Sequence, residues 1–314
     1  MWIRSYDDVD PFEVYRLNMA AFGWGFDPAA ARRIRNDDPY VMDELALYAG
    51  ERGHVVARAI PLRMAVRLTT GRETVGGIAG VCSLPQVWGK GYVRRLMEHL
   101  HAMFREQDMR ISTLTTSLNI RGYRVYRGLG YVDLAAFYRG SRFVPANQSK
   151  PIGIRFRKVS RKDFPRIQSL FGSYVRDLLG WTERSADAPQ RGRIWDRENL
   201  ERFRLVIRDG RLVGYLRSRL RDGYLLEEVI VPRTEDFRLA VRAMECTARG
   251  KFVDSNWITA GKDQDRFRGL GYTLDPIADT TMALSLSKHL RTADLPSLFG
   301  GTSRRFVHYP TDDF

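Results

Sequence analysis

The stretch that decides the fold spans residues 74–107 and reads TVGGIAGVCSLPQVWGKGYVRRLMEHLHAMFREQ. Its first part, up to Pro85, is apolar and contains glycines, which is typical of a buried strand. Residues 92–107 carry apolar side chains at helical spacing and predict an amphipathic helix. Gly89 and Gly91 lie between the two segments. The stretch therefore predicts a strand, a glycine-bearing turn and a long helix that begins at that turn.

This turn is a candidate site for a phosphate or pyrophosphate. The first N–H groups of a helix have no partner within the helix, and together with the helix dipole they attract anions. Glycines let the backbone come close to the anion. A plain tight turn would have the same composition, so the pattern alone leaves both interpretations open.

A second pattern is the pentapeptide RGLGY, which occupies residues 127–131 and again residues 268–272. Its glycines suit the end of a helix where a positive φ is needed, so we interpret the shared residues as structural. The first copy follows Tyr126 and the second follows Phe267. Packing tolerates the loss of a hydroxyl group, whereas proton transfer does not. Tyr126 is therefore a candidate proton donor, against the alternative of a tyrosine packed between helix and sheet.

The second half of the chain repeats the plan of the first. Residues 154–171 echo residues 3–22, and an apolar run ends at Pro232 as the earlier one ends at Pro85. The segment PRTEDFR that starts at Pro232 contains no glycine. The chemistry-bearing features are thus present only in the first copy.

These repeats divide the chain into parts. The polar stretch PANQSKP at residues 145–151 is a linker candidate because prolines bound it. We therefore predict a catalytic domain over residues 1–145, a degenerate copy without catalytic function over residues 152–290, and a C-terminal tail over residues 291–314. The expected fold class is α/β with a mixed sheet, used twice in tandem.

Composition sets further bounds. A chain of 314 residues with 44% apolar residues is long enough for two globular domains. It contains no apolar run long enough to span a membrane, and its start does not resemble a signal peptide, so we expect a cytoplasmic protein. Two cysteines make neither a disulfide framework nor a zinc site, and we expect no metal.

The net charge of +14 favours an anionic partner: a nucleic acid, an anionic membrane or a multiply charged small ligand. The basic residues are spread along the chain, and no nucleic-acid-binding motif accompanies them. We therefore expect neither a nucleic acid nor a membrane as the partner.

The strand, the loop Pro85-Gln86-Val87-Trp88-Gly89-Lys90-Gly91-Tyr92-Val93, the helix, and then Asn119 and Tyr126 with RGLGY resemble the GNAT superfamily of acetyl-CoA-dependent N-acetyltransferases. The order of domains is most similar to the enhanced-intracellular-survival (Eis-type) enzymes. These have a catalytic GNAT domain, a degenerate second one and a sterol-carrier-like third domain. Only about 24 residues follow Leu290, so the resemblance leads us to expect that the full third domain is absent. The sequence also departs from the family at Trp88, where Arg or Gln is usual, and at Val93, where Gly or Ala is usual.

The resemblance implies roles for particular residues. The backbone of Val81 and Ser83 would pair with the pantetheine arm of acetyl-CoA, and Asn119 would contact the pantetheine or adenine side. Tyr126 would protonate the departing thiolate. The loop and helix start would hold the pyrophosphate through main-chain N–H groups and basic side chains; these residues are Trp88, Gly89, Lys90, Gly91, Tyr92, Val93 and Arg94.

The general base is not evident, because the strand GGIAGVCS carries no carboxylate. The Eis-type resemblance implies that the chain's own C-terminal carboxylate, that of Phe314, enters the first domain's site. A frayed terminus is the alternative. Asp312 and Asp313 lie near Phe314 in the sequence. Weaker candidates for the base are a water relay and the side chains of His54, Asp37, Asp38 and Glu44.

The acceptor site is expected near Phe22, Trp24 and Phe26, because aromatic residues beside acidic ones suit a cationic amine. Phe22 and Trp24 are equally well explained as core residues. The predicted activity is transfer of an acetyl group to a primary amine of a small molecule or protein, by direct attack in a ternary complex. The rival hypothesis is a catalytically inactive acyl-CoA-binding sensor or scaffold. We expect a monomer or a small homo-oligomer.

Overall fold

The computed structural model describes residues 1–184, 199–220 and 224–309, and its strands join in one mixed sheet. The strands of the first half are β1 (Trp2–Ser5), β2 (Leu47–Glu51), β3 (His54–Leu68), β4 (Gly71–Ser83), β5 (Ile111–Ser117) and β6 (Val132–Phe143). Those of the second half are β7 (Ile154–Lys158), β8 (Phe203–Arg208), β9 (Arg211–Leu220), β10 (Tyr224–Ile230), β11 (Phe252–Ile258) and β12 (Thr273–Ser285). The predicted α/β class with a mixed sheet is confirmed.

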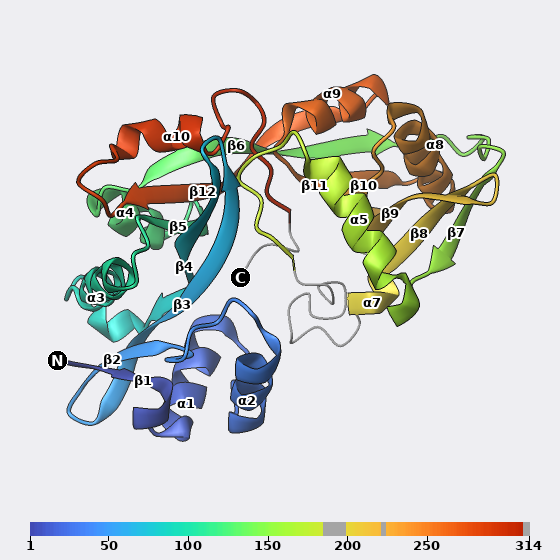
Figure 1. Ribbon diagram of the computed structural model, residues 1–314. Coiled ribbons are helices and arrows are strands. Elements are labelled where there is room, and N and C mark those ends of the chain that lie inside the picture. Colours follow the sequence, from blue (N-terminus) through green and yellow to red (C-terminus); the bar gives the residue numbers. More distant parts are fainter. Residues whose placement is uncertain (185–198, 221–223, 310–314) are drawn as a thin grey trace.

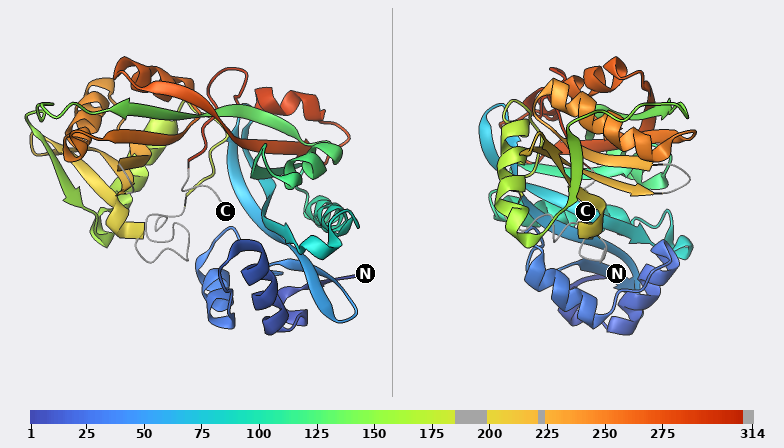
Figure 2. Two further views of the ribbon diagram at one scale, coloured as in Figure 1. Left: turned by 180° about the vertical axis from the view of Figure 1, so that it is seen from behind. Right: turned by 90° about the vertical axis from the view of Figure 1, so that its right-hand side faces the viewer.

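The strand order is β1-β2-β3-β4-β5-β12-β6-β11-β10-β9-β8-β7, so the two halves exchange strands. β12 pairs with β5 along Asp279–Ser285, whereas the start of β12 and the end of β6 pair with each other. β6 also pairs with β11. Figure 2 shows β6 and β12 running from one half into the other. Each half therefore contains a strand supplied by the other, which the sequence repeat does not reveal.

Helices cover both faces of the first half. They are α1 (Pro11–Phe22), α2 (Pro28–Asp37), α3 (Tyr92–Glu106) and α4 (Arg121–Gly128). Alternation along β2 separates two cores: Tyr48 packs in the cluster under α1 and α2, and its neighbours Leu47 and Ala49 pack in the cluster under α3. Figure 1 shows the two helix pairs on opposite sides of the strands.

The second half carries α5 (Phe164–Val175), the short α7 (Asn199–Arg202), α8 (Thr234–Glu245) and α9 (Gly261–Gly269), and the short α10 (Leu295–Leu298) begins the tail. None of these helices, nor any other in the described part of the chain, is long and apolar enough to cross a membrane.

The RGLGY repeats end helices in the same way. The N–H group of Tyr131 donates to the carbonyl of Tyr126, and that of Tyr272 donates to Phe267, each at 3.1 Å. Gly130 has a φ of 96° and Gly271 one of 83°, which glycine adopts without strain. The structural interpretation of the pentapeptide agrees with this geometry.

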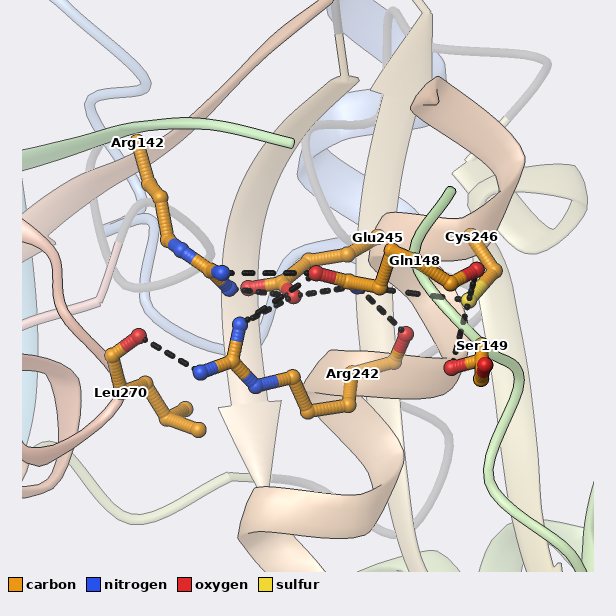
Figure 3. Close-up of polar contacts among 7 residues, drawn as sticks. All are labelled: Arg142, Gln148, Ser149, Arg242, Glu245, Cys246 and Leu270. Atoms are coloured by element: carbon orange, nitrogen blue, oxygen red, sulfur yellow. Dashed lines mark hydrogen bonds and ion pairs between the residues drawn. The ribbon is translucent and has the colours of Figure 1, made fainter. Parts of the chain in front are cut away.

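The predicted linker is tied to the second half by a buried carboxylate (Figure 3). The side chain of Glu245 is fully buried and accepts from Arg142 at 2.7 Å, Gln148 at 2.8 Å and Arg242 at 3.0 Å. Cys246, beside it, contacts the linker backbone through its thiol. Since Arg142 lies on β6 and Gln148 in the linker, this cluster joins the crossing strand, the linker and α8.

Candidate functional site

The site begins where two parallel strands separate. β4 and β5 pair only at Gly76 with Ser112 and at Gly77 with Thr113, and beyond these residues they diverge. Diverging strands leave unpaired backbone on their facing edges. Residues 77–81 of β4 and 113–116 of β5 line a cavity of about 240 Å³ in the resulting gap.

A bulge in β4 shapes one wall of the cavity. Ala79 pairs with Ile60, and Cys82 pairs with Arg58, so β4 carries one residue more than β3 between these pairs. Gly80, in the bulge, has a φ of 54°. A Cβ atom here would lie 2.6 Å from the Arg58 guanidinium, so glycine meets both a conformational and a steric requirement.

The glycine-bearing turn leads from β4 into α3 as predicted. Gly89 and Gly91 have φ values of 80° and 83°. Helical hydrogen bonding starts with the N–H group of Arg95 donating to Gly91 O at 3.1 Å. The N–H groups at the very start of α3 therefore have no helical acceptor and are available to an anion. Lys90 and Arg94, both exposed, add positive charge there.

Two of the predicted main-chain donors are already used within the turn. The N–H group of Trp88 donates to Pro85 O and that of Lys90 to Val87 O, both at 3.1 Å. The Trp88 side chain lies 49% exposed under the Arg121 guanidinium, and its Nε1 approaches Ser83 O at 3.4 Å. The predicted anion-binding N–H groups that have no acceptor in the turn are therefore those of Gly89, Gly91 and the first residues of α3. The carbonyl of Ser83, whose backbone is a predicted pantetheine partner, is thus in contact with the indole of Trp88.

Tyr126 reaches the cavity from α4. Its side chain is 5% exposed, and its ring packs edge-on against Tyr131 at 6.2 Å. Burial raises the pKa of the Tyr126 hydroxyl well above 10, so the group keeps its proton at neutral pH. Phe267, its counterpart on α9, is buried against Phe237 and Tyr272 in the core of the second half.

The second half and the tail close the cavity. The segment after α5 pairs with β3 through Val66 and Thr182, and the tail pairs with that segment through Leu179 and Phe306. In Figure 1 the last described residues descend between the two halves. Gly180, Thr182, Phe299, Phe306 and His308 are thereby brought to the wall. The first half does not enclose the cavity by itself.

His308 is a pocket residue that no sequence motif marks. Its Nε2 atom lies 3.4 Å from the Thr115 hydroxyl, and its ring packs against Trp257 and Phe137. A single histidine in the stretch FVHYP carries no recognisable signal, so only the strand exchange and the path of the tail reveal it.

The three predicted acceptor aromatics have different environments. Phe22 lines the cavity at 40% exposure and stacks with Trp24, whose ring centre lies 5.7 Å away. Phe26 is 4% exposed and packs against Tyr6 in the core under α1 and α2. Phe26 is therefore a core residue that does not line the cavity.

The other candidates lie apart from the cavity. Asn119 is exposed after β5, and its N–H group donates to the Ser117 hydroxyl. His54 contacts Glu13 at 3.3 Å. None of the weaker base candidates among the described residues (Asp37, Asp38, Glu44 and His54) lines the cavity. Phe314, Asp312 and Asp313 lie outside the described residues.

In the second half an arginine side chain occupies the region that corresponds to the glycine-bearing turn of the first half. Arg266 on α9 donates to the carbonyls of Val231 and Pro232 and to the Thr234 hydroxyl, at 3.2, 2.6 and 3.2 Å. Its side chain thus binds the loop before α8. In the described part of the chain, the metal-ligand side chains His, Cys, Asp and Glu form no group of three or more that would hold a metal ion.

Comparisons with known proteins agree with this geometry. Residues 3–132 match the family model described as acetyltransferase (GNAT) domain. None of the curated proteins matches the sequence.

Solved structures resemble both halves. A GCN5-related N-acetyltransferase from Kribbella flavida is 21% identical, with a TM-score of 0.66 over 91% of this chain and 72% of that one. A GCN5-related N-acetyltransferase from Anabaena variabilis is 16% identical, with a TM-score of 0.67 over 90% and 72%. Eis1 from Mycobacterium abscessus is 15% identical, with a TM-score of 0.61 over 91% and 74%.

At these identities the likeness concerns the fold, and it extends across the tandem halves. The family match covers the half that holds the diverging strands, the glycine turn and Tyr126. Over residues 3–132, this chain therefore matches the acetyltransferase (GNAT) domain family.

Proposed function

We propose that the protein is an acetyl-CoA-dependent N-acetyltransferase that transfers the acetyl group to a primary amine by direct attack in a ternary complex. The observation that carries this proposal is the position of Tyr126, a buried and protonated hydroxyl on the wall of the cavity between β4 and β5. The start of α3, a site suited to pyrophosphate, lies at the end of the same strand.

Acetyl-CoA would bind along the separated edge of β4. The backbone of Val81 and Ser83 would pair with the pantetheine arm, and the N–H groups at the start of α3 would bind the pyrophosphate, with Lys90 and Arg94 adding charge. Because Trp88 contacts Ser83 O, its indole would move or stack on the ligand when acetyl-CoA binds.

The thioester would then lie beside Tyr126. Attack by the amine forms the C–N bond and breaks the C–S bond, and Tyr126 donates its proton to the leaving sulfur. Because burial raises the pKa of Tyr126, its hydroxyl is protonated at neutral pH and holds a proton for the leaving sulfur. The tail would supply the group that takes the proton from the amine. Phe314 remains a candidate for this step.

The acceptor would enter past Phe22 and Trp24, which are 40% and 39% exposed and present aromatic surface to a cationic amine. The second half would act as a scaffold that closes the site through residues 180–182 and the tail. A cytoplasmic location, where acetyl-CoA is available, fits this activity.

The test is to incubate the protein with acetyl-CoA and a panel of primary amines, namely spermidine, benzylamine and a lysine-containing peptide. Thiol release and the mass of the acetylated amine are then measured. We expect transfer to at least one amine, and Tyr126→Phe should reduce it. Binding of acetyl-CoA without any transfer would instead support the acyl-CoA sensor hypothesis.

A further inference from the structure

The cavity wall is poor in groups that exchange protons. It consists mainly of glycine, threonine and aliphatic residues from β3, β4 and β5. Among the described residues that line it, Tyr126 and His308 alone carry side chains that titrate between strongly acidic and strongly basic pH. One comes from the first half and the other from the C-terminal tail.

His308 is held by contacts that fix its ring. Its backbone N–H donates to the Thr259 hydroxyl at 3.1 Å, and its ring packs 5.5 Å from Trp257 and 5.9 Å from Phe137. Nε2 points to the Thr115 hydroxyl on β5, at 3.4 Å. The side chain is 7% exposed and lines the cavity. The imidazole is therefore held in place by its neighbours at the cavity wall.

A buried, positioned imidazole and a buried phenol on the wall of one cavity suit a reaction with two proton transfers. We propose that His308 is the general base that removes the proton from the acceptor ammonium group, while Tyr126 serves as the acid. This inference rests on the proposed N-acetyltransferase function and assigns the step for which the first half offers no carboxylate on the cavity wall.

The protons balance as follows. The ammonium nitrogen loses two protons on its way to the amide. His308 accepts the first at a ring nitrogen and passes it to water, which leaves a neutral amine whose lone pair attacks the thioester carbon. As the C–S bond breaks, Tyr126 gives its proton to sulfur. The second proton leaves the nitrogen through water and restores Tyr126, so the net products are the amide, the thiol and one solvent proton.

Within the described residues, few other charges lie near His308. On β5 and β6 its described neighbours are Thr115 and Phe137. On β11 it meets Trp257, whose Nε1 donates to Asp279 of β12 at 2.9 Å. Tyr309, next in the chain, is buried near Asp263. The groups that would influence its ionisation in the described structure are thus Tyr126, Asp279, Tyr309 and Asp263.

The experiment compares His308→Gln and His308→Phe with the wild type, using the same amine panel from pH 6 to about 10. The phenylalanine variant preserves the aromatic packing on Trp257 and Phe137, and the glutamine variant preserves a polar group. His289→Gln, at an exposed histidine of the same C-terminal region, is the matched control. A chain that ends at Tyr309 keeps His308 and lacks the C-terminal carboxylate of Phe314.

We expect both His308 variants to lower kcat roughly 100-fold at pH 7, with the KM for acetyl-CoA within about twofold of wild type. The deficit should shrink as the pH rises, because the amine then loses its proton without help. Added imidazole should restore part of the rate. A purely structural role would move neither the pH profile nor the imidazole response.

Three outcomes overturn the inference. Wild-type kcat in both His308 variants would do so, as would a deficit that is the same at every pH. Loss of turnover in the chain ending at Tyr309, with full turnover in the His308 variants, would assign the base to the terminal carboxylate. Failure of the wild type to acetylate any amine would instead overturn the proposed function, and the two failures are therefore distinguishable.

Discussion

The guanidinium of Arg58 donates from Nε to the carbonyl of Gly80 at 3.2 Å, and so fixes the bulge of β4 from the strand beside it. Arg58 is 2% exposed and also donates to Asn18 of α1. Its charge lies over the ring of Phe22 at 5.1 Å, and no carboxylate among the described residues forms an ion pair with it. One buried cation thus joins α1, the aromatic wall and the bulge that lines the cavity.

Replacement of this arginine by lysine should therefore damage both fold and turnover. Lysine keeps the charge, but it lacks the planar guanidinium group that donates hydrogen bonds to both Gly80 and Asn18. We expect Arg58→Lys to lower the free energy of unfolding by about 3 kcal/mol and to reduce kcat for acetyl transfer. Denaturant unfolding and steady-state kinetics measure the two effects. Arg63→Lys, on the exposed side of the same strand, is the control and should change neither. A stability loss with unchanged kcat would limit Arg58 to a folding role.

Tyr126→Phe should reduce kcat roughly 100-fold while the affinity for acetyl-CoA stays the same, since only the proton donor is removed. The wild-type rate should show no loss attributable to Tyr126 ionisation below pH 10, because burial raises its pKa. Tyr123→Phe is the matched control: Tyr123 lies on the same helix and donates to Asp133 at 2.9 Å. Equal activity of Tyr126→Phe and wild type would remove Tyr126 from the mechanism.

The two basic residues at the start of α3 should contribute to acetyl-CoA affinity. Lys90→Ala and Arg94→Ala are each expected to weaken binding about fivefold at low salt, and less at high salt, because exposed charges are screened. Isothermal titration at two salt concentrations measures this. Arg238→Ala, at an exposed arginine in the first turns of α8, tests whether the second half takes part. A comparable loss there would contradict the assignment of acetyl-CoA to the first half.

The sequence pattern predicted much of the local structure because local physics determines it. The apolar run before Pro85 was expected to be a strand and lies in β4, and residues 92–107 were expected to be helical and form α3 over Tyr92–Glu106. The glycine turn and the helix ends at RGLGY follow from φ values that other residues seldom adopt. Tyr126 became a candidate because the second copy of the pentapeptide has Phe267 at the matching position.

What the sequence did not predict depends on contacts between distant segments. The exchange of β6 and β12 pairs strands from different halves of the chain. The sequence of neither strand indicates which strand it will pair with. His308 gains its position only from that exchange and from the path of the tail. The core position of Phe26 has the same origin, because sequence alone does not distinguish an aromatic residue near a site from one in the core.

Stability should fall in mild acid because of one buried histidine. His101 on α3 is 4% exposed and pairs with the Tyr131 hydroxyl at 2.8 Å, and burial lowers its pKa from 6.5 to about 4. Between these values the unfolded chain binds a proton that the folded chain does not. Stability is therefore lost as the pH falls from about 6.5 towards 4, by about 3 kcal/mol in all. His101→Gln should flatten this part of the pH profile in denaturant unfolding. His99→Gln, at an exposed site on the same helix, should leave it unchanged.

Glu245 accepts hydrogen bonds from Arg142 of β6, Gln148 of the linker and Arg242 of α8, and its replacement should therefore destabilise the protein. Glu245→Gln keeps the shape of the side chain and removes its charge, which leaves Arg142 and Arg242 without their carboxylate. Since the Glu245 side chain is fully buried and those of Arg142 and Arg242 are 16% and 28% exposed, we expect a loss of about 3 kcal/mol in the free energy of unfolding. Glu235→Gln, at an exposed residue of the same helix, is the control and should change the free energy of unfolding little.

The polar contacts of Glu245 join β6, which crosses between the halves, to α8 of the second half. Because the exchanged strands also join the halves, thermal unfolding of the Glu245 variant should remain a single transition at lower temperature. Two separate transitions would show that this cluster, rather than the exchanged strands, makes the halves unfold together.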